Sequence, residues 1–392
     1  MLDVLAKSLL LYKLKQVIIT RLIKSGIEKL LFLGKAIIIY GPRQTGKTTL
    51  LKFLKESTTK KVKYLNCDEP DIRNQLTDKT SSELRVLIGD AKIVLIDEAQ
   101  RIKNIGLTLK LIIDQIIDVQ LIVTGSSAFE LANRINEPLT GRKFDFLLLP
   151  FSTEELVNHH GELEERRHLE HRLVYGAYPD IVVNPGQANI LLNNLVNSYL
   201  FNDIFAFQDV RKPEIIEKLL EALALQLGSE VSINELSKLL QIDRETVMRY
   251  LDLLEKTFVI FRLPSLSRNL RNEIKKNKKV FFYDNGVRNA IISNFNNIDS
   301  RSDVGALWEN YIISEKIKYQ HYNSLFYKNF FWRTKQQQEI DFIEDYGGII
   351  HAFEIKWNPM KEVRFSKTFK NAYPNHELTV VTPSNYLEVL CK

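Results

Sequence analysis

Short apolar runs alternate with amphipathic stretches along the first part of the chain. Four such runs, bounded by polar or turn-forming residues, predict buried strands at residues 35–40, 92–96, 120–124 and 144–149. Residues 49–55 show helical spacing of leucine and phenylalanine soon after the first run. Strands that alternate with helices predict an α/β fold with a parallel sheet and helices on both faces.

The pattern changes in the middle of the chain. Residues 151–228 place apolar side chains three or four positions apart, which predicts a largely helical segment. Two predicted helices and two predicted strands follow, at residues 233–240, 244–255, 258–263 and 279–283. Asp243 stands where it can cap the second of these helices. Helix, turn, helix and strand pair is the order of a winged helix-turn-helix module.

The C-terminal part of the chain predicts a second α/β unit. An amphipathic helix over residues 305–313 precedes a strand, a turn and a strand over residues 339–357. The chain therefore divides into four predicted segments. They are the parallel-sheet domain (1–150), a helical segment (151–228), the winged helix (229–290) and the second α/β domain (291–392).

A glycine-rich segment follows the first predicted strand at once. It matches the pattern G-x-x-x-x-G-K-[ST], in which backbone N–H groups surround phosphate oxygens, the lysine reaches the β- and γ-phosphates and the hydroxyl binds Mg²⁺. The helix predicted after it places the phosphates at a helix N-terminus, which favours anions. The alternative is a glycine-rich turn that binds no ligand. The predicted nucleotide-binding residues are Gly41, Pro42, Arg43, Gln44, Thr45, Gly46, Lys47 on the phosphates, Thr48 on the metal, and Thr49.

Two adjacent acids, Asp97 and Glu98, stand at the end of the second predicted strand. A carboxylate at the end of a strand beside the phosphate loop can hold Mg²⁺, as the Walker B aspartate does, and Asp97 fits that role. Glu98 can orient or deprotonate an attacking water molecule, which is the role of a general base. The pair therefore predicts hydrolysis of the nucleotide, and the alternative for both residues is a solvated loop.

Two further residues are candidates for catalysis. Ser126 follows the third predicted strand and can contact the γ-phosphate or the attacking water. Arg142 precedes the fourth predicted strand and can act as an arginine finger, in its own chain or a neighbouring one, or pair with a carboxylate instead. The chain contains no Asn-Lys-x-Asp guanine-reading motif, so ATP is favoured over GTP.

The composition narrows the class of protein. A hydrophobic content of 45% supports buried cores, and no apolar stretch is long enough to predict a membrane span. The N-terminal residues mix lysine and arginine with apolar residues, which is unlike a signal peptide. The two cysteines, Cys67 and Cys391, lie far apart, which favours a reducing cytoplasm without a disulfide framework.

The basic charge of the chain is local. Residues 262–279 hold seven basic residues and one acid, so this segment alone accounts for the net charge of +6. Such a segment predicts an anionic partner, and DNA phosphates would contact Arg268, Arg271, Lys275, Lys276, Lys278 and Lys279 in the predicted wing. The second helix of the module is not electropositive, because it carries Asp252 and Glu255 among other acids. The alternative is a winged helix that packs on protein and leaves a solvated basic loop.

Charged residues also mark the last predicted hairpin. Strand alternation places Glu354 and Lys356 on one face. Asp341 on the neighbouring strand can share a divalent cation with Glu354, and Lys356 can stabilise an attacking hydroxide or a scissile phosphate. Glu309 on the preceding helix is a further candidate ligand. The arrangement resembles the PD-(D/E)XK nuclease constellation, and the alternative is a hairpin with a charged outer face.

The order of these motifs resembles that of prokaryotic AAA-type P-loop ATPases that end in an uncharacterised winged-helix and nuclease-like region. The matching segments are residues 41–49, 97–100, 139–142, 250–254, 283–286 and 354–356. The resemblance implies an AAA-like sheet, bound ATP and Mg²⁺, and a position for the Arg142 segment near a nucleotide.

The first hypothesis is a cytoplasmic, Mg²⁺-dependent ATPase whose nucleotide state is coupled to DNA held by its C-terminal domains. The rival hypothesis is an ATP-driven regulatory switch that binds a protein partner and cuts nothing. A small-molecule kinase is disfavoured because it leaves the C-terminal half unexplained. The activity of the nuclease-like site and the formation of a homo-oligomer stay open at this point.

Overall fold

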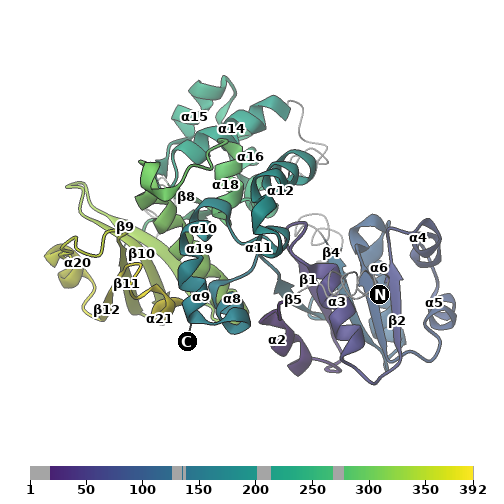
Figure 1. The fold of residues 1–392 in the computed structure, drawn as a ribbon. Helices are drawn as coiled ribbons and strands as arrows, with labels where there is room; N and C mark the ends of the chain where they lie inside the picture. The colour runs from purple at the N-terminus through teal and green to yellow at the C-terminus, as the bar shows by residue number, and fades with distance from the viewer. Residues whose placement is uncertain (1–17, 126–134, 136–137, 201–212, 268–277, 392) are drawn as a thin grey trace, which may run out of the picture.

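Three lobes follow one another in the computed structural model, which describes residues 18–125, 135, 138–200, 213–267 and 278–391 (Figure 1). A parallel sheet with flanking helices forms the N-terminal lobe, a largely helical region lies in the middle, and a mixed sheet forms the C-terminal lobe. The predicted α/β class and this order of parts are confirmed. Every helix in the described ranges is too short or too polar to span a lipid bilayer.

Five strands form the N-terminal sheet, in the order β2-β3-β4-β1-β5 with every neighbouring pair parallel. Their bounds are β1 Ala36–Tyr40, β2 Val62–Asn66, β3 Ile93–Asp97, β4 Gln120–Gly125 and β5 Lys143–Leu147. Four of the five were predicted from apolar runs. The sequence analysis missed β2, because this edge strand is mostly half-buried and mixes polar with apolar residues.

Helices cover both faces of this sheet because its central strands are apolar on both sides. Ile37 and Ile39 of β1 share a core cluster with Leu51 of α3, whereas Ile38 between them packs with Leu84 and Leu109 on the opposite face. The helices of the first face are α2 (Ile23–Lys29) and α3 (Lys47–Glu56). Those of the second face are α4 (Pro70–Leu76), α5 (Ser81–Ile88) and α6 (Ile105–Gln115), and a 3₁₀ turn follows β3 at Ala99–Arg101.

The middle lobe is helical, as predicted. Its first helices are α8 (Thr153–His160), α9 (Glu162–Arg167), α10 (Leu169–Tyr175), α11 (Pro179–Val183), α12 (Ala188–Asn194) and α14 (Pro213–Leu225), with a 3₁₀ turn at Pro185–Gln187 and a π-helical segment at Leu195–Leu200. The predicted helix pair follows as α15 (Ile233–Leu240) and α16 (Arg244–Lys256). Asp243 caps α16, since its Oδ1 accepts a 2.8 Å hydrogen bond from the Thr246 backbone.

A small antiparallel sheet completes the middle lobe. Its order is β6-β8-β7, from β6 (Glu230–Val231), β7 (Ile260–Leu263) and β8 (Lys278–Phe282). The two longer strands were predicted, and β6 was missed because it is only two residues long.

The C-terminal lobe is an α/β unit, and its sheet has the order β12-β11-β10-β9. Only β11 and β12 run parallel. Helix α18 (Asn285–Ile291) follows β8 and packs into the core of the middle lobe through Val287 and Ala290. The elements of the C-terminal lobe are a 3₁₀ turn (Ile298–Ser300), α19 (Val304–Tyr322), β9 (Lys328–Arg333), β10 (Glu339–Tyr346), β11 (Ile349–Ile355), α20 (Lys367–Ala372), β12 (His376–Val381) and α21 (Tyr386–Leu390). The predicted hairpin corresponds to β10 and β11, whereas β9 and β12 were not predicted.

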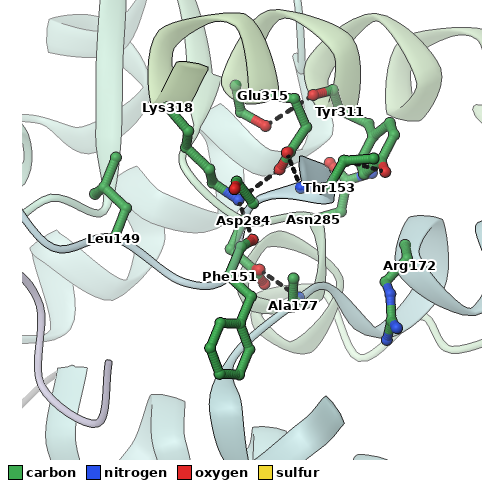
Figure 2. Close-up of polar contacts among 12 residues, drawn as sticks. Leu149, Phe151, Thr153, Arg172, Ala177, Asp284, Asn285, Tyr311, Glu315 and Lys318 are labelled. Carbon is green, nitrogen blue, oxygen red and sulfur yellow. Dashed lines mark hydrogen bonds and ion pairs between the residues drawn. The ribbon is translucent and has the colours of Figure 1, made fainter. Parts of the chain in front are cut away.

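Helix α19 is buried on nearly all sides, and it holds the segment that leaves the N-terminal sheet after β5 (Figure 2). Glu315 accepts a 2.6 Å hydrogen bond from the Thr153 backbone N–H. Lys318 donates a 3.0 Å bond to the carbonyl of Phe151 and pairs with Glu315 at 2.6 Å. Both charged side chains are almost fully buried, so this junction (residues 149–153 with α19) is fixed by polar contacts that water does not reach.

Asn310 of α19 binds both backbone groups of one residue in β8. Its amide accepts a 2.7 Å hydrogen bond from the backbone N–H of Phe282 and donates a 3.0 Å bond to the carbonyl of the same residue. An Asn310→Ala variant leaves both buried backbone groups without these partners, so we expect its free energy of unfolding to fall by about 2–4 kcal/mol. Urea unfolding measures this loss. The exposed Asn193→Ala change on α12 should cost less than about 1 kcal/mol, and an equal loss in both variants would contradict the assignment.

Candidate functional site

The glycine-rich loop, Asp97 and Thr124 meet at one edge of the N-terminal sheet. Strand β4 lies between β1 and β3, with Thr124 level with Ile39 and Val123 level with Ile96. The carboxyl ends of β1, β3 and β4 therefore lie side by side. The structure thus brings together residues that are more than 80 positions apart in the chain.

The loop itself is shaped by two glycines with positive φ. Gly41 has φ 152°, and a Cβ atom there would lie 2.0 Å from the carbonyl oxygen of Leu148. Gly46 has φ 89° and is the N-cap of α3, where no side chain accepts from the first helical N–H groups. Lys47 is buried, and its ammonium donates to the carbonyls of Gly41 at 2.9 Å and Pro42 at 2.7 Å. The loop therefore offers uncapped backbone donors and a lysine beside them, which suits a phosphate group.

Asp97 is buried and its carboxylate is held in place by two hydroxyl groups. The Tyr64 hydroxyl donates to Oδ2 at 2.7 Å, and the Thr124 hydroxyl donates to Oδ1. Burial raises the pKa of Tyr64 well above its ordinary value, and the hydrogen bond to Asp97 raises it further, so the phenol remains a donor. Sequence analysis missed both hydroxyls as site residues. The signal for Thr124 was its place at the end of the strand beside the loop.

Glu98 has a strained backbone. Its φ of 55° lies in the left-handed region, which costs a residue with a side chain about 1–3 kcal/mol. The Glu98 N–H donates to the Thr124 hydroxyl at 3.2 Å, and the Gln100 amide donates to Glu98 Oε2 at 2.6 Å. The first bond ties the Glu98 backbone to β4, and the second holds its carboxylate.

Arg142 lies at the amino end of β5, whereas the phosphate loop lies at the carboxyl end of the neighbouring strand β1. Its carbonyl accepts a hydrogen bond from Ala36, the first residue of β1, and its side chain pairs with Asp114 at 2.8 Å. The phosphate loop leaves from the other end of β1, so Arg142 does not lie beside the phosphate loop of its own chain. An arginine finger in a neighbouring chain stays a prediction. Ser126 lies outside the described residues.

The loop faces the middle lobe across several hollows. Pro42 and Arg43 line a small cavity with Tyr178 and Phe258. Gln44 lines another of about 190 Å³. A larger hollow at the loop has about 380 Å³ and adjoins Gly46, and its walls come from residues 18–21, α3, Phe151 and α11. That volume lies in the range of small-molecule sites.

Arg21 connects this loop to the rest of the molecule, and sequence analysis did not single it out. Its buried guanidinium donates to the carbonyls of Thr45 at 2.7 Å and Leu149 at 2.6 Å. It also pairs with Glu155 at 2.9 Å and donates to the Tyr322 hydroxyl at 3.1 Å. One side chain therefore contacts the phosphate loop, the junction and the last turn of α19.

The C-terminal acids lie close together but are paired with lysines. Lys356 lies 2.8 Å from Asp341 and 2.7 Å from Glu354, and Lys279 lies 3.0 Å from Glu309. Burial raises the pKa of Glu309 to about 7, and burial together with Asp341 raises that of Glu354 to about 7. Across the described parts of the chain, no three His, Cys, Asp or Glu side chains are placed to hold one metal ion.

The predicted basic wing is only partly available to an anionic ligand. Lys279 is 3% exposed and paired with acids, so its predicted contact with DNA phosphates is corrected. Arg262 at the other end of the segment pairs with Asp252 and Glu255. Lys278 is exposed, and Arg268, Arg271, Lys275 and Lys276 lie outside the described residues.

Comparison with known families supports the first lobe most clearly. A model of an AAA domain matches residues 33–157. Two models of domains of unknown function, DUF8612 and DUF4143, match residues 166–298 and 304–390. The N-terminal lobe is accordingly AAA-like and of the P-loop ATPase type, and these models do not name an activity for the other two.

Relatives occur in bacteria and in an archaeon. An uncharacterised protein of Mycobacterium tuberculosis is 25% identical over 339 residues, which are 84% of this chain and 72% of the relative. One of Haemophilus influenzae is 25% identical over 282 residues, or 65% and 68% of the two chains. One of Methanocaldococcus jannaschii is 23% identical over 345 residues, or 82% and 75%. The similarity therefore extends well beyond the AAA-like lobe.

Gly41 and Gly141 provide a matched test of the loop geometry. Both have positive φ, but only at Gly41 would a Cβ collide with the backbone, whereas nothing lies within 4 Å of one at Gly141. We expect Gly41→Ala to lower the free energy of unfolding by about 3 kcal/mol or more and Gly141→Ala by about 1 kcal/mol. Thermal unfolding compares the two variants, and equal shifts in Tm would contradict the close approach of Gly41 to Leu148.

Proposed function

We propose that this chain binds ATP with Mg²⁺ at the edge of its N-terminal sheet, hydrolyses it there, and couples its nucleotide state to DNA through the C-terminal lobes. The observation that carries the proposal is the meeting of the phosphate loop with Asp97, Glu98 and Thr124 at the ends of β1, β3 and β4. A solvated pair of acids would not be tied to a neighbouring strand by buried hydroxyl contacts.

Each residue at this edge has a separate task. Lys47 moves its ammonium from two loop carbonyls to the β- and γ-phosphates, while the N–H groups at the start of α3 donate to phosphate oxygens. Thr48 and Asp97 would hold Mg²⁺, which would supply positive charge against the phosphates when bound. Thr124 keeps Asp97 oriented. Glu98 orients the attacking water and accepts its proton, and Ser126 senses the γ-phosphate.

The hollow beside Gly46 is the place for the nucleoside. Apolar walls from Ile19, Phe53 and Phe151 suit a purine ring, and Asp180 and Asn184 supply polar groups at its rim. Together with the missing guanine-reading motif, this supports ATP as the nucleotide.

Two features support DNA as the coupled partner. Helices α15 and α16 with the β6-β8-β7 sheet have the element order of a winged helix, and the predicted wing, residues 262–279, joins β7 to β8. The order α19, β9, β10, β11, α20, β12 and the placement of Asp341, Glu354 and Lys356 resemble a PD-(D/E)XK nuclease domain. A protein partner in place of DNA is the alternative, favoured by the acids of α16 that neutralise Arg262.

ATP turnover of the purified chain tests the first part of the proposal. Lys47→Ala should weaken binding of a fluorescent ATP analogue about tenfold or more, because it removes charge-assisted bonds to phosphate. Glu98→Gln should keep binding and lower kcat by about 100-fold. Thr124→Val should lower kcat about tenfold with little change in binding, since it releases Asp97. Lys52→Ala, an exposed position on the same helix, is the control, and turnover unchanged in all three variants would contradict the site.

The salt dependence of DNA binding tests the second part. Neutralising Arg268, Arg271, Lys275 and Lys276 together removes as many as four phosphate contacts, so the slope of log affinity against log salt should flatten by up to about 3.6. Turnover should also lose any stimulation by single- or double-stranded DNA. An unchanged slope would place the contacts elsewhere, and turnover indifferent to DNA in the unaltered chain would favour a protein partner.

A further inference from the structure

Arg21 divides the nitrogens of its guanidinium among four partners. Nε donates to Glu155 at 2.9 Å, and Nη1 donates to the Thr45 carbonyl at 2.7 Å. Nη2 donates to the Leu149 carbonyl at 2.6 Å and to the Tyr322 hydroxyl at 3.1 Å. Such a set requires the rigid, planar fork of a guanidinium, which a lysine ammonium does not reproduce. Nη1 is thus the nitrogen that acts on the phosphate loop.

The bond to Thr45 fixes the orientation of one peptide unit in the phosphate loop. The Thr45 carbonyl and the Gly46 N–H belong to the same planar peptide group, in which they point in opposite directions. Gly46 has φ 89°, and a glycine lets this plane rotate more freely than a residue with a side chain does. Because Arg21 holds the carbonyl, the N–H is directed away from Arg21, and the positive charge beside the carbonyl makes that N–H a stronger donor. In the G-x-x-x-x-G-K pattern, backbone N–H groups of this kind bind phosphate oxygens.

Two residues from other parts of the chain hold Arg21 in this orientation. The Glu155 carboxylate is buried, and the oxygen that pairs with Arg21 also accepts a 2.8 Å bond from the Leu22 N–H. The Tyr322 hydroxyl accepts a 3.1 Å bond from the Leu149 N–H and donates to the carbonyl of the same residue at 3.4 Å. Burial raises the pKa of Tyr322, so the hydroxyl keeps its proton. Since Tyr322 is the last residue of α19, an element of the C-terminal lobe takes part in orienting the loop.

We propose, on the basis of the proposed function, that Arg21 and Tyr322 are positioning residues which set the affinity of the phosphate loop for a nucleotide. Arg21 acts through the peptide unit that carries the Gly46 N–H, and Tyr322 acts through Arg21. Neither side chain takes part in the chemical step. A displacement of α19 that withdraws the Tyr322 hydroxyl lowers the affinity for nucleotide, so the C-terminal lobe controls nucleotide binding through this one group.

Equilibrium binding of fluorescent ATP and ADP analogues to the full chain, combined with ATP turnover at saturation, tests this proposal. Tyr322→Phe should raise the Kd of both nucleotides about threefold, and Arg21→Gln should raise it about tenfold, because the charge-assisted bond to the loop is lost. The kcat of Tyr322→Phe should stay within about twofold of that of the unaltered chain, since binding rather than chemistry is affected. Tyr319→Phe removes a hydroxyl from the same helix, where the ring lies 5.5 Å from the Lys316 ammonium, and should leave the Kd unchanged.

A double-mutant cycle separates positioning from a general loss of packing. Adding Tyr322→Phe to Arg21→Gln should raise the Kd no further, because the hydroxyl acts only through the guanidinium, and effects that add would overturn the proposal. Arg21→Lys keeps the positive charge, so its Kd should lie between those of the unaltered chain and Arg21→Gln. Should the Arg21 variants fail to fold by circular dichroism, Tyr322→Phe decides the outcome alone, and an unchanged Kd in that folded variant overturns the proposal.

Failure of the positioning role and failure of the proposed function give different results. If Lys47→Ala leaves the Kd for ATP unchanged, the loop is not the nucleotide site and both proposals fall. If Lys47→Ala weakens binding but a folded Tyr322→Phe variant binds like the unaltered chain, only the positioning role is overturned. A fall in kcat without a change in Kd in Tyr322→Phe overturns it as well.

Discussion

The burial of charged residues along α19 is the constraint on which the arrangement of the three lobes depends. Glu309 and Tyr322 are 13 positions apart, which is roughly 20 Å along a helix at 1.5 Å per residue. Within that length the helix contacts Lys279 and Phe282 of strand β8, Glu344 of β10, the junction and Arg21. Because Arg21 also donates to the Thr45 carbonyl, one rigid element reaches from the acids of the last sheet to within one side chain of the phosphate loop.

These ion pairs determine the register in which α19 packs more than they contribute to the free energy of unfolding. A buried pair such as Lys318 with Glu315 contributes little net free energy, because the loss of hydration offsets the attraction. An unpaired member is costly, so any alternative packing that slides α19 past the junction leaves an ammonium or a carboxylate without a partner. The helix therefore accepts one register of residues 149–153, and the phosphate loop is presented to the middle lobe in one orientation.

The sequence predicted the parts of this molecule that depend on neighbours along the chain. Strands β1, β3 and β4, helix α3 and the α15–α16 pair follow from local periodicity, and the phosphate loop is contiguous. The edge strands β2, β6, β9 and β12 were not predicted, because each is short, mixes polar with apolar residues, or both. The hydroxyl support of Asp97, the Arg21 contacts and the burial of Lys279 join residues far apart in sequence, which no local pattern encodes. Arg142 precedes β5, which runs parallel to β1, so it lies at the end of the sheet opposite the phosphate loop, and an action on a neighbouring chain stays a prediction.

The contacts of α19 with the N-terminal lobe also limit how domains can recombine between relatives. The boundaries of the three matched family models fall at residues 157, 166, 298 and 304, so α19 belongs to the last model while the segment it grips belongs to the first. A recombination event at those boundaries would separate Glu315 and Lys318 from the backbone of residues 151–153 that they satisfy. A chimera of two relatives should therefore take α19 and the end of the ATPase-like lobe from the same parent. These two segments are inherited together, although they belong to different domains.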